Sequence, residues 1–136
     1  MTALYRACTV LDMSNETSGK ALVINPDGTT ETIQFERGSE LAKLQGLVGG
    51  YIEAVYGYTS AKAEEPDVTL FCNEEGKILN QPVNFMATTL WWSLNRYATG
   101  VDHLHGVVVV TGGADRNGDT LPVPGKVAEL VEQMGG

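Results

Sequence analysis

Cysteine, histidine and long apolar runs are scarce in this sequence, and each shortage excludes a class of protein. The 136 residues include two cysteines, Cys8 and Cys72, and two histidines. Because the cysteines lie far apart and follow no metal-binding spacing, we expect reduced, buried thiols rather than a disulfide or a metal site. The longest apolar run, Val107 to Val110, is far too short to span a membrane and is typical of a buried strand. We therefore expect no membrane partner.

Basic residues are scarce too. Nine Lys and Arg residues stand against 17 Asp and Glu residues, which gives a net charge of −8 at pH 7. Binding DNA or RNA irrespective of sequence needs a basic surface, so we expect no nucleic-acid partner. The acidic residues are scattered, and solubility explains them better than mimicry of nucleic acid does. The chain does not begin with the basic and apolar segments of an export signal, which makes the cytosol the default location.

Turn-forming residues divide the chain into short strands and helices. The Asn25-Pro26-Asp27-Gly28 turn predicts a β-hairpin from residues 21–24 and 29–35. A similar turn signal at residues 73–76 predicts a second hairpin, from residues 68–72 and 77–79. Further strands are expected at residues 4–11, 51–58 and 106–111, and helices at residues 40–48, 84–97 and 124–134, which begin after Ser39, at Asn84 and at Pro124. The pattern predicts a single α+β domain over residues 1–136, with a mixed, mainly antiparallel sheet and about three helices packed on it.

Motifs that would favour catalysis or metal binding are weak. The segment from Gly113 to Thr120 follows a strand, but an acid stands where a phosphate-binding loop needs lysine, and a calcium loop would need a glycine and a glutamate that are missing. A surface turn is the better interpretation. His103 and His105 share a face if extended, but a metal site needs further ligands, and none is evident. We expect no catalytic residue, no metal and no cofactor.

The helix predicted from Asn84 carries apolar side chains on two faces. One face holds Ala87, Leu90, Trp91, Leu94, Tyr97 and Ala98. Phe85 and Trp92 lie nearly opposite, beside Arg96. This pattern fits a helix sandwiched between two packed layers. It also fits an exposed patch that docks a partner or a second copy of the chain, since Trp and Arg are favoured at interfaces. Phe85, Trp92 and Arg96 are therefore candidate interface residues.

Several sequence blocks together resemble a known family. The most specific block is LQGLVGGYIE at residues 44–53, with ALVINPDG at residues 21–28 before it. NEEGK at residues 73–77 and PVNFMAT at residues 82–88 follow in order, and Gly106 precedes a valine run. These blocks resemble the family called domain of unknown function 3846, which is abundant in phages of actinobacteria and in mobile elements.

The resemblance covers about residues 20–112. Residues 1–19, the tryptophan pair and the C-terminal helix look like local additions to the family pattern. The resemblance implies a phage gene product acting in the bacterial host cytoplasm. It brings no known reaction or ligand.

Polar residues within the shared blocks form a candidate ligand site if strand 51–58 pairs with the second hairpin. The candidate ligand-binding residues are Gln45, Tyr51, Glu53, Asn73, Glu74 and Asn84. Local roles are the favoured alternative, because Asn84 can cap a helix, Asn73 can form a turn and Gln45 can bridge free backbone groups.

Three functions are open at this point. The leading hypothesis is an accessory protein that binds a host protein or itself without catalysis. The second is a binder of small molecules, such as one that sequesters a nucleotide signal. The third is a small hydrolase built on glutamates such as Glu53 and Glu74. An exposed apolar patch would favour the first, a deep pocket lined by the polar residues the second, and a buried carboxylate of raised pKa in a cleft the third.

Overall fold

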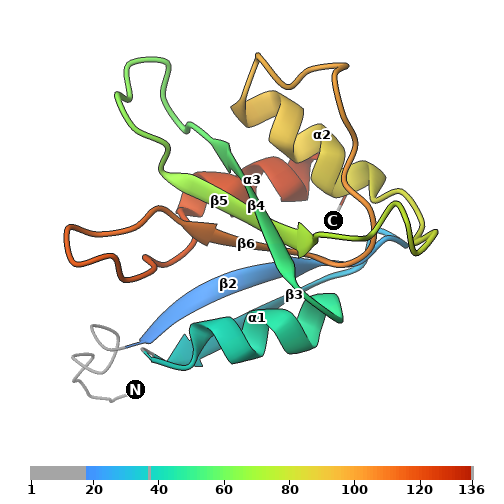
Figure 1. Ribbon diagram of the computed structural model, residues 1–136. Helices are drawn as coiled ribbons and strands as arrows, with labels where there is room; N and C mark the ends of the chain where they lie inside the picture. The colour runs from blue at the N-terminus through green and yellow to red at the C-terminus, as the bar shows by residue number, and fades with distance from the viewer. Residues whose placement is uncertain (1–17, 37, 136) are drawn as a thin grey trace.

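The computed structural model describes residues 18–36 and 38–135, which form an antiparallel sheet and three helices (Figure 1). The elements are β2 (Ser18–Ile24), β3 (Thr30–Glu36), α1 (Glu40–Val48), β4 (Ile52–Gly57), β5 (Val68–Asn73), α2 (Phe85–Leu94), β6 (Val108–Gly112) and α3 (Gly125–Gln133). The strand order is β3-β2-β6-β5-β4, and every neighbouring pair is antiparallel. The predicted α+β class is confirmed. The strand predicted at residues 4–11 lies outside the described residues.

The first predicted hairpin is present. β2 pairs with β3 from Ser18 opposite Glu36 to Ile24 opposite Thr30. The turn between them is closed by the N–H of Gly28, which donates to the carbonyl of Asn25 (2.9 Å), and Gly28 takes a φ of 90° that glycine tolerates. The carboxylate of Asp27 accepts hydrogen bonds from the hydroxyl and the N–H of Thr29, and these lower the pKa of Asp27.

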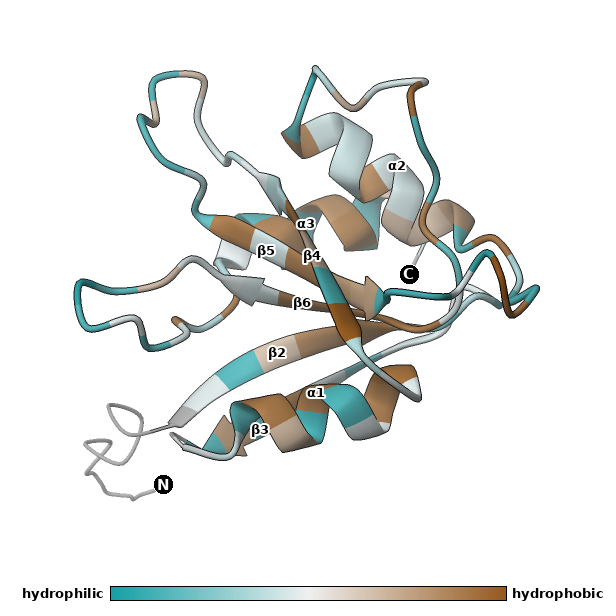
Figure 2. Ribbon diagram, viewed as in Figure 1, coloured by the Kyte–Doolittle hydropathy of each residue, from teal (hydrophilic) through white to brown (hydrophobic). Residues whose placement is uncertain are grey.

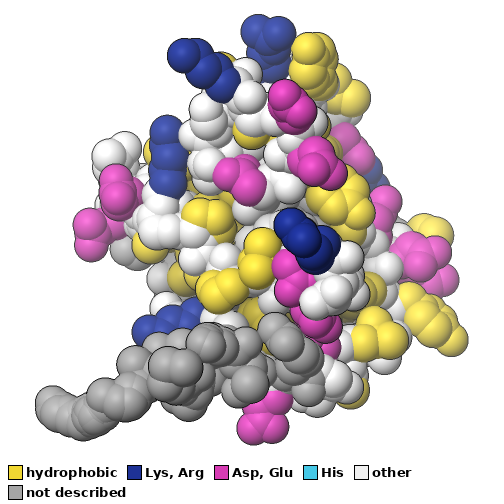
Figure 3. Space-filling view, turned by 90° about the vertical axis from the view of Figure 1, so that its left-hand side faces the viewer, with side chains coloured by type: hydrophobic (Ala, Val, Ile, Leu, Met, Phe, Trp, Pro, Cys, Tyr) yellow, Lys and Arg dark blue, Asp and Glu magenta, His cyan; other side chains and the backbone are white. Residues whose placement is uncertain are grey.

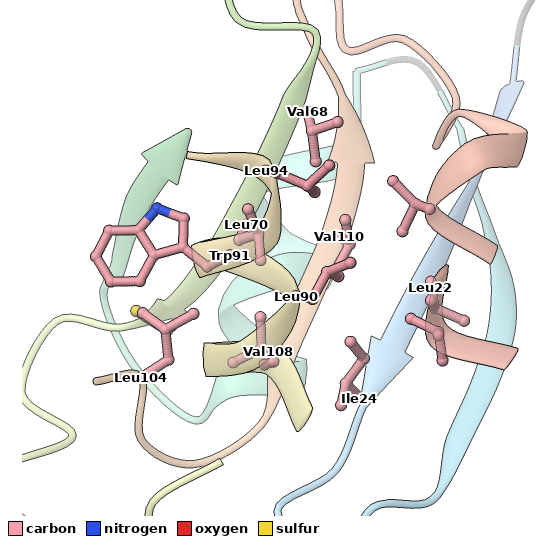
Figure 4. Close-up of a cluster of buried hydrophobic side chains, with 14 of the residues drawn as sticks. Leu22, Ile24, Val68, Leu70, Leu90, Trp91, Leu94, Leu104, Val108 and Val110 are labelled. Atoms are coloured by element: carbon pink, nitrogen blue, oxygen red, sulfur yellow. The ribbon is translucent and has the colours of Figure 1, made fainter. Parts of the chain in front are cut away.

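The valine-rich strand β6 lies between β2 and β5, where an all-apolar strand is expected. Its side chains alternate between the two faces of the sheet, so Val108 and Val110 join one core and Val109 joins the other. The larger core lies under α2 and α3 and is shown in Figure 4, where side chains from β2, β5, β6 and α2 point toward one another. The smaller core lies under α1. The apolar segments of the central strands and of the helix faces that cover them are visible in Figure 2.

α1 contacts the sheet through Leu44 and Val48, and it ends at Val48 as predicted, because Gly49 takes a left-handed φ of 82°. Leu41 of the same helix is 57% exposed. Ser39 occupies the cap position, but its hydroxyl donates to the carbonyl of Glu36 instead of accepting from the helix.

The second predicted hairpin is not formed. β5 already has β4 on one side and β6 on the other, so residues 77–79 have no free strand edge to join. Residues 74–80 instead form successive turns. The N–H of Leu79 donates to the carbonyl of Glu75 (2.9 Å), and the N–H of Gln81 donates to the carbonyl of Gly76 (2.9 Å). Asn80 ends this turn segment in a left-handed conformation with a φ of 57°.

α2 ends at Leu94, three residues before the predicted end, because the chain is extended at Asn95. Tyr97 therefore does not share the buried face of the helix and is 76% exposed. The carbonyl of Tyr56 on the edge strand β4 accepts from the indole Nε1 of Trp91 (3.2 Å) and from Nδ2 of Asn95 (2.9 Å). The end of α2 is thus fastened to the edge of the sheet.

Candidate functional site

The six polar residues proposed for a ligand site do not all come together, although the N–H of Glu74 donates to the carbonyl of Tyr51 (2.8 Å). Glu53 lies opposite Cys72 in the sheet, and Asn73 lies opposite Ile52, so the side chains of Glu53 and Asn73 point to opposite faces. Asn73 lies on the face covered by α1, whereas Asn84 begins α2 on the other face. None of the six lines any of the three hollows found on the described surface.

The local roles of the two asparagines are confirmed. Oδ1 of Asn84 accepts the N–H of Ala87 (2.9 Å) and caps α2, while Nδ2 donates to the carbonyls of Ile24 and Gly106 (2.9 Å each). Oδ1 of Asn73 accepts the N–H of Glu75 (2.7 Å) and forms the turn, while Nδ2 donates to the carbonyl of Val48 at the end of α1 (3.1 Å). Both amides therefore stabilise the fold.

The remaining members of that set lie at or near the surface. The side chains of Tyr51, Glu53 and Glu74 are exposed, and that of Gln45 is partly exposed. The carbonyl of Gln45 accepts the N–H groups of Gly49 (2.9 Å) and Gly50 (3.1 Å), so the backbone of this residue closes the helix. These positions leave the ligand-site hypothesis without a shared pocket.

The candidate interface residues have three different environments. Phe85 is 72% exposed at the first turn of α2. Trp92 is half-buried, since its Nε1 donates to the carbonyl of Asp102 (3.0 Å) and its ring meets that of His103 edge-on at 5.3 Å. Arg96 is exposed beyond the end of the helix. Trp92 therefore fastens the 96–105 loop, and a partner would meet Phe85 and Arg96 at opposite ends of α2.

Exposed apolar side chains lie on the segments that adjoin the start of α2, where the N–H of Asn84 donates to the carbonyl of Leu104 (2.8 Å). In the turn segment, Ile78 is 79% exposed and Leu79 is 55% exposed. The adjacent Lys77 forms an ion pair with Asp102, which brings the exposed Val101 to the same part of the molecule. We call Ile78, Leu79, Phe85 and Val101 the apolar end. The turn segment and the start of α2 lie on the same side of the ribbon in Figure 1.

A cleft of about 600 Å³ lies at the other end of α2. We call it the α2 cleft. Its walls are the loop from Tyr58 to Glu64, residues 93–97 at the end of the helix, and Lys126 and Leu130 of α3. The volume is within the range of small-molecule sites. No local sequence pattern predicts this cleft, because its walls come from segments about 30 residues apart.

Two aspartates that lie outside the hydrolase hypothesis have a lowered pKa. A hydrogen bond from the side chain of Lys77 lowers the pKa of Asp102, and hydrogen bonds from Thr29 lower the pKa of Asp27. An acid catalyst needs the opposite shift. Acidic side chains are scattered over the face in Figure 3, with basic ones standing singly among them.

The weak metal and phosphate motifs have structural explanations. Nδ1 of His105 lies 3.0 Å from the carbonyl of Gln81, and His103 packs against Trp92. The carboxylate of Asp115 accepts the N–H groups of Asn117 and Asp119, which makes the 113–120 segment a surface turn. Within residues 18–36 and 38–135 there is no group of three or more metal-ligating side chains, and no helix there is long and apolar enough to cross a membrane.

Cys72 is a buried free thiol, as predicted, whereas Cys8 lies outside the described residues. Burial and then the charge of Glu53 raise the pKa of Cys72 to about 11.

We expect iodoacetamide at pH 8 to alkylate a folded Cys8→Ser variant about a hundredfold more slowly than the same variant in denaturant. A raised pKa in the folded state also means that this thiol's contribution to stability is lost as pH rises from 9 towards 11. Equal alkylation rates in the two states would contradict the assignment.

Residues 18–36 and 38–135 form a small α+β structure, built on an antiparallel sheet, in which the α2 cleft and the apolar end lie at opposite ends of α2. Residues 19–135 match the family described as domain of unknown function (DUF3846), so the chain belongs to that family. The match extends past the expected limit of residue 112 and includes α3, which corrects the expectation that the C-terminal helix is a local addition. No curated protein and no solved structure matches the chain.

Proposed function

We propose that this is a phage-encoded accessory protein that acts in the bacterial host cytoplasm by binding another protein, a host factor or a second copy of itself, without catalysing a reaction. The apolar end carries this proposal. Monomeric proteins rarely group large apolar side chains in water, and such groups mark interaction surfaces. Phe85 and Ile78 are each more than 70% exposed there.

The surroundings of the apolar end also suit a protein interface. The ion pair between Lys77 and Asp102 fixes the turn segment against the 96–105 loop, and Trp92 fastens the same loop from inside. The apolar side chains therefore project from a backbone that is already held in place. A preorganised surface loses less conformational entropy when it binds.

Substitution at the apolar end tests the proposal. We expect Ile78→Gln combined with Leu79→Gln to abolish binding to the partner, or to convert an oligomer to a monomer, because the variant removes about half of the apolar anchors. Sedimentation across a range of protein concentrations measures self-association. Affinity capture from a lysate of the actinobacterial host, compared between wild type and variant, measures host binding.

A matched control is Leu41→Gln, which removes an equally exposed leucine from α1 at a distance from the apolar end. This variant should keep the oligomeric state and the captured protein of the wild type. The proposal is wrong if the wild type is a monomer and captures nothing that the double variant loses. It is equally wrong if Leu41→Gln and the double variant behave alike.

A further inference from the structure

The α2 cleft is distinct from the apolar end, and two cations, Arg96 and Lys126, line it. Within the described residues, neither Arg96 nor Lys126 forms an ion pair. Glu64 is the single acidic residue among those that line the cleft. A chain with a net charge of −8 therefore keeps two cations against one carboxylate at this cleft. The local charge favours an anion.

Arg96 is oriented by its neighbour. Its guanidinium donates to the hydroxyl of Tyr97 (3.3 Å) and lies over the Tyr97 ring at 5.2 Å from the centroid. The hydrogen bond and the charge of Arg96 lower the pKa of Tyr97. A guanidinium has five N–H donors, and no other hydrogen bond from it reaches the described part of the chain. The remaining donors can form the paired hydrogen bonds that phosphate and carboxylate accept.

The opposite wall of the cleft is held in place before any ligand arrives. The N–H of Thr59 donates to Asp67 (2.8 Å), and its hydroxyl donates to the other oxygen of the same carboxylate. The N–H of Tyr58 donates to the carbonyl of Leu94 (2.8 Å), which joins this loop to the end of α2. The loop and the helix therefore form a fixed concave surface.

The cleft also offers apolar and aromatic area. The partly buried Tyr58 and the exposed Tyr97 supply two rings, and Leu130 of α3 adds an aliphatic side chain. Tyrosine rings stack on planar rings and present a hydroxyl for hydrogen bonding. A ligand that fits must therefore combine a flat apolar body with a negative charge.

We propose that the α2 cleft binds a small molecule that carries a planar ring and one anionic group, a phosphate or a carboxylate. Arg96 and Lys126 bind the anion, and Tyr58 and Tyr97 pack against the ring. A mononucleotide and an aromatic carboxylic acid share this chemistry. Glu64 at the rim disfavours ligands with a larger negative charge.

Calorimetric titration of the full chain with four probes tests the proposal. AMP carries ring and phosphate, indole-3-acetate carries ring and carboxylate, adenosine carries the ring alone, and inorganic phosphate the anion alone. We expect AMP or indole-3-acetate to bind with a Kd below about 1 mM, and adenosine and phosphate to bind at least about tenfold more weakly. The stronger of the first two probes identifies which anion the cleft prefers.

Charge-removing variants locate the site. Arg96→Gln and Lys126→Gln should each weaken binding of the stronger probe about tenfold. Lys43→Gln removes the same charge from α1 on the other face of the sheet and should leave the affinity within about twofold. In NMR spectra the probe should shift amide signals of residues 58–64 and 93–97.

Three results would each overturn the proposal. In the first, AMP and indole-3-acetate bind no more tightly than inorganic phosphate, so the site takes an ion without a ring. In the second, Arg96→Gln and Lys126→Gln bind the probe as tightly as Lys43→Gln does. In the third, the shifted amide signals lie outside the walls of the cleft, so the ligand occupies another surface.

Discussion

Replacing Asn84 with alanine is expected to lower the free energy of unfolding by about 3–5 kcal/mol, a large part of the stability of a domain of this size. The side chain is fully buried and makes three hydrogen bonds, to the N–H of Ala87 and to the carbonyls of Ile24 and Gly106. Alanine removes the helix cap and leaves buried backbone groups without partners. Thermal unfolding followed by circular dichroism should show a fall of about 10–20 °C.

The variant Asn84→Asp tests the helix cap separately from the two hydrogen bonds to the carbonyls of Ile24 and Gly106. An aspartate keeps the acceptor for Ala87 but turns the two amide donors into an oxygen that faces the carbonyls of Ile24 and Gly106. Burial beside carbonyl oxygens should raise the pKa of this carboxyl, so the variant gains stability as pH falls and loses it as pH rises.

An exposed asparagine supplies the control. Asn117→Ala, in the 113–120 turn, should stay within about 0.5 kcal/mol of the wild type. If Asn84→Ala is as mild as this control, the hydrogen bonds of Asn84 do not hold the layers together.

Gly112→Ala is expected to destabilise the fold by about 2–4 kcal/mol. A Cβ at this position would lie 2.4 Å from the carbonyl oxygen of Pro122 and 3.0 Å from that of Leu121. These are backbone atoms. The segment that carries them is bonded to β6 through the N–H of Gly112 (2.9 Å) and the carbonyl of Gly113 (2.8 Å), so it can withdraw only by breaking these bonds. Urea unfolding measures the loss.

Gly46→Ala is the matched control. Gly46 lies within α1, and a Cβ there would meet nothing within 4 Å. Alanine is the better helix former, so this variant should gain about 0.5–1 kcal/mol. Opposite signs for the two glycine variants are expected. Two variants of equal stability would show that the approach of residues 121–122 to β6 does not restrict side-chain size.

Elements defined by contiguous residues were predictable from the sequence. The turn at residues 25–28 is specified by the proline and glycine within it. The valine run has apolar side chains on both faces of its strand, so this strand occupies the middle of the sheet. Gly49 ends α1 for the same local reason. The family assignment was also predictable, because its blocks are continuous stretches of sequence.

Features that depend on distant pairing were not predictable. Residues 77–79 could have formed a strand, but only the sheet order shows that β5 has no free edge. The predicted end of α2 is too late, because the side chains of Trp91 and Asn95 donate to the carbonyl of Tyr56, which lies 35 and 39 residues earlier in the chain. The burial of Asn84 and the α2 cleft were unpredictable for the same reason, because each depends on contacts between segments that are far apart in the sequence.

The fastening of α2 to β4 also affects how copies of this chain can associate. An edge strand with free backbone groups is a template on which another chain can add a strand, and such addition leads to fibrils. Here the outward carbonyl of Tyr56 is occupied by Trp91 and Asn95, and the N–H of Tyr58 by Leu94. A second copy therefore cannot continue the sheet across this end of β4. A tryptophan that packs the core thus also occupies a backbone group at the edge of the sheet.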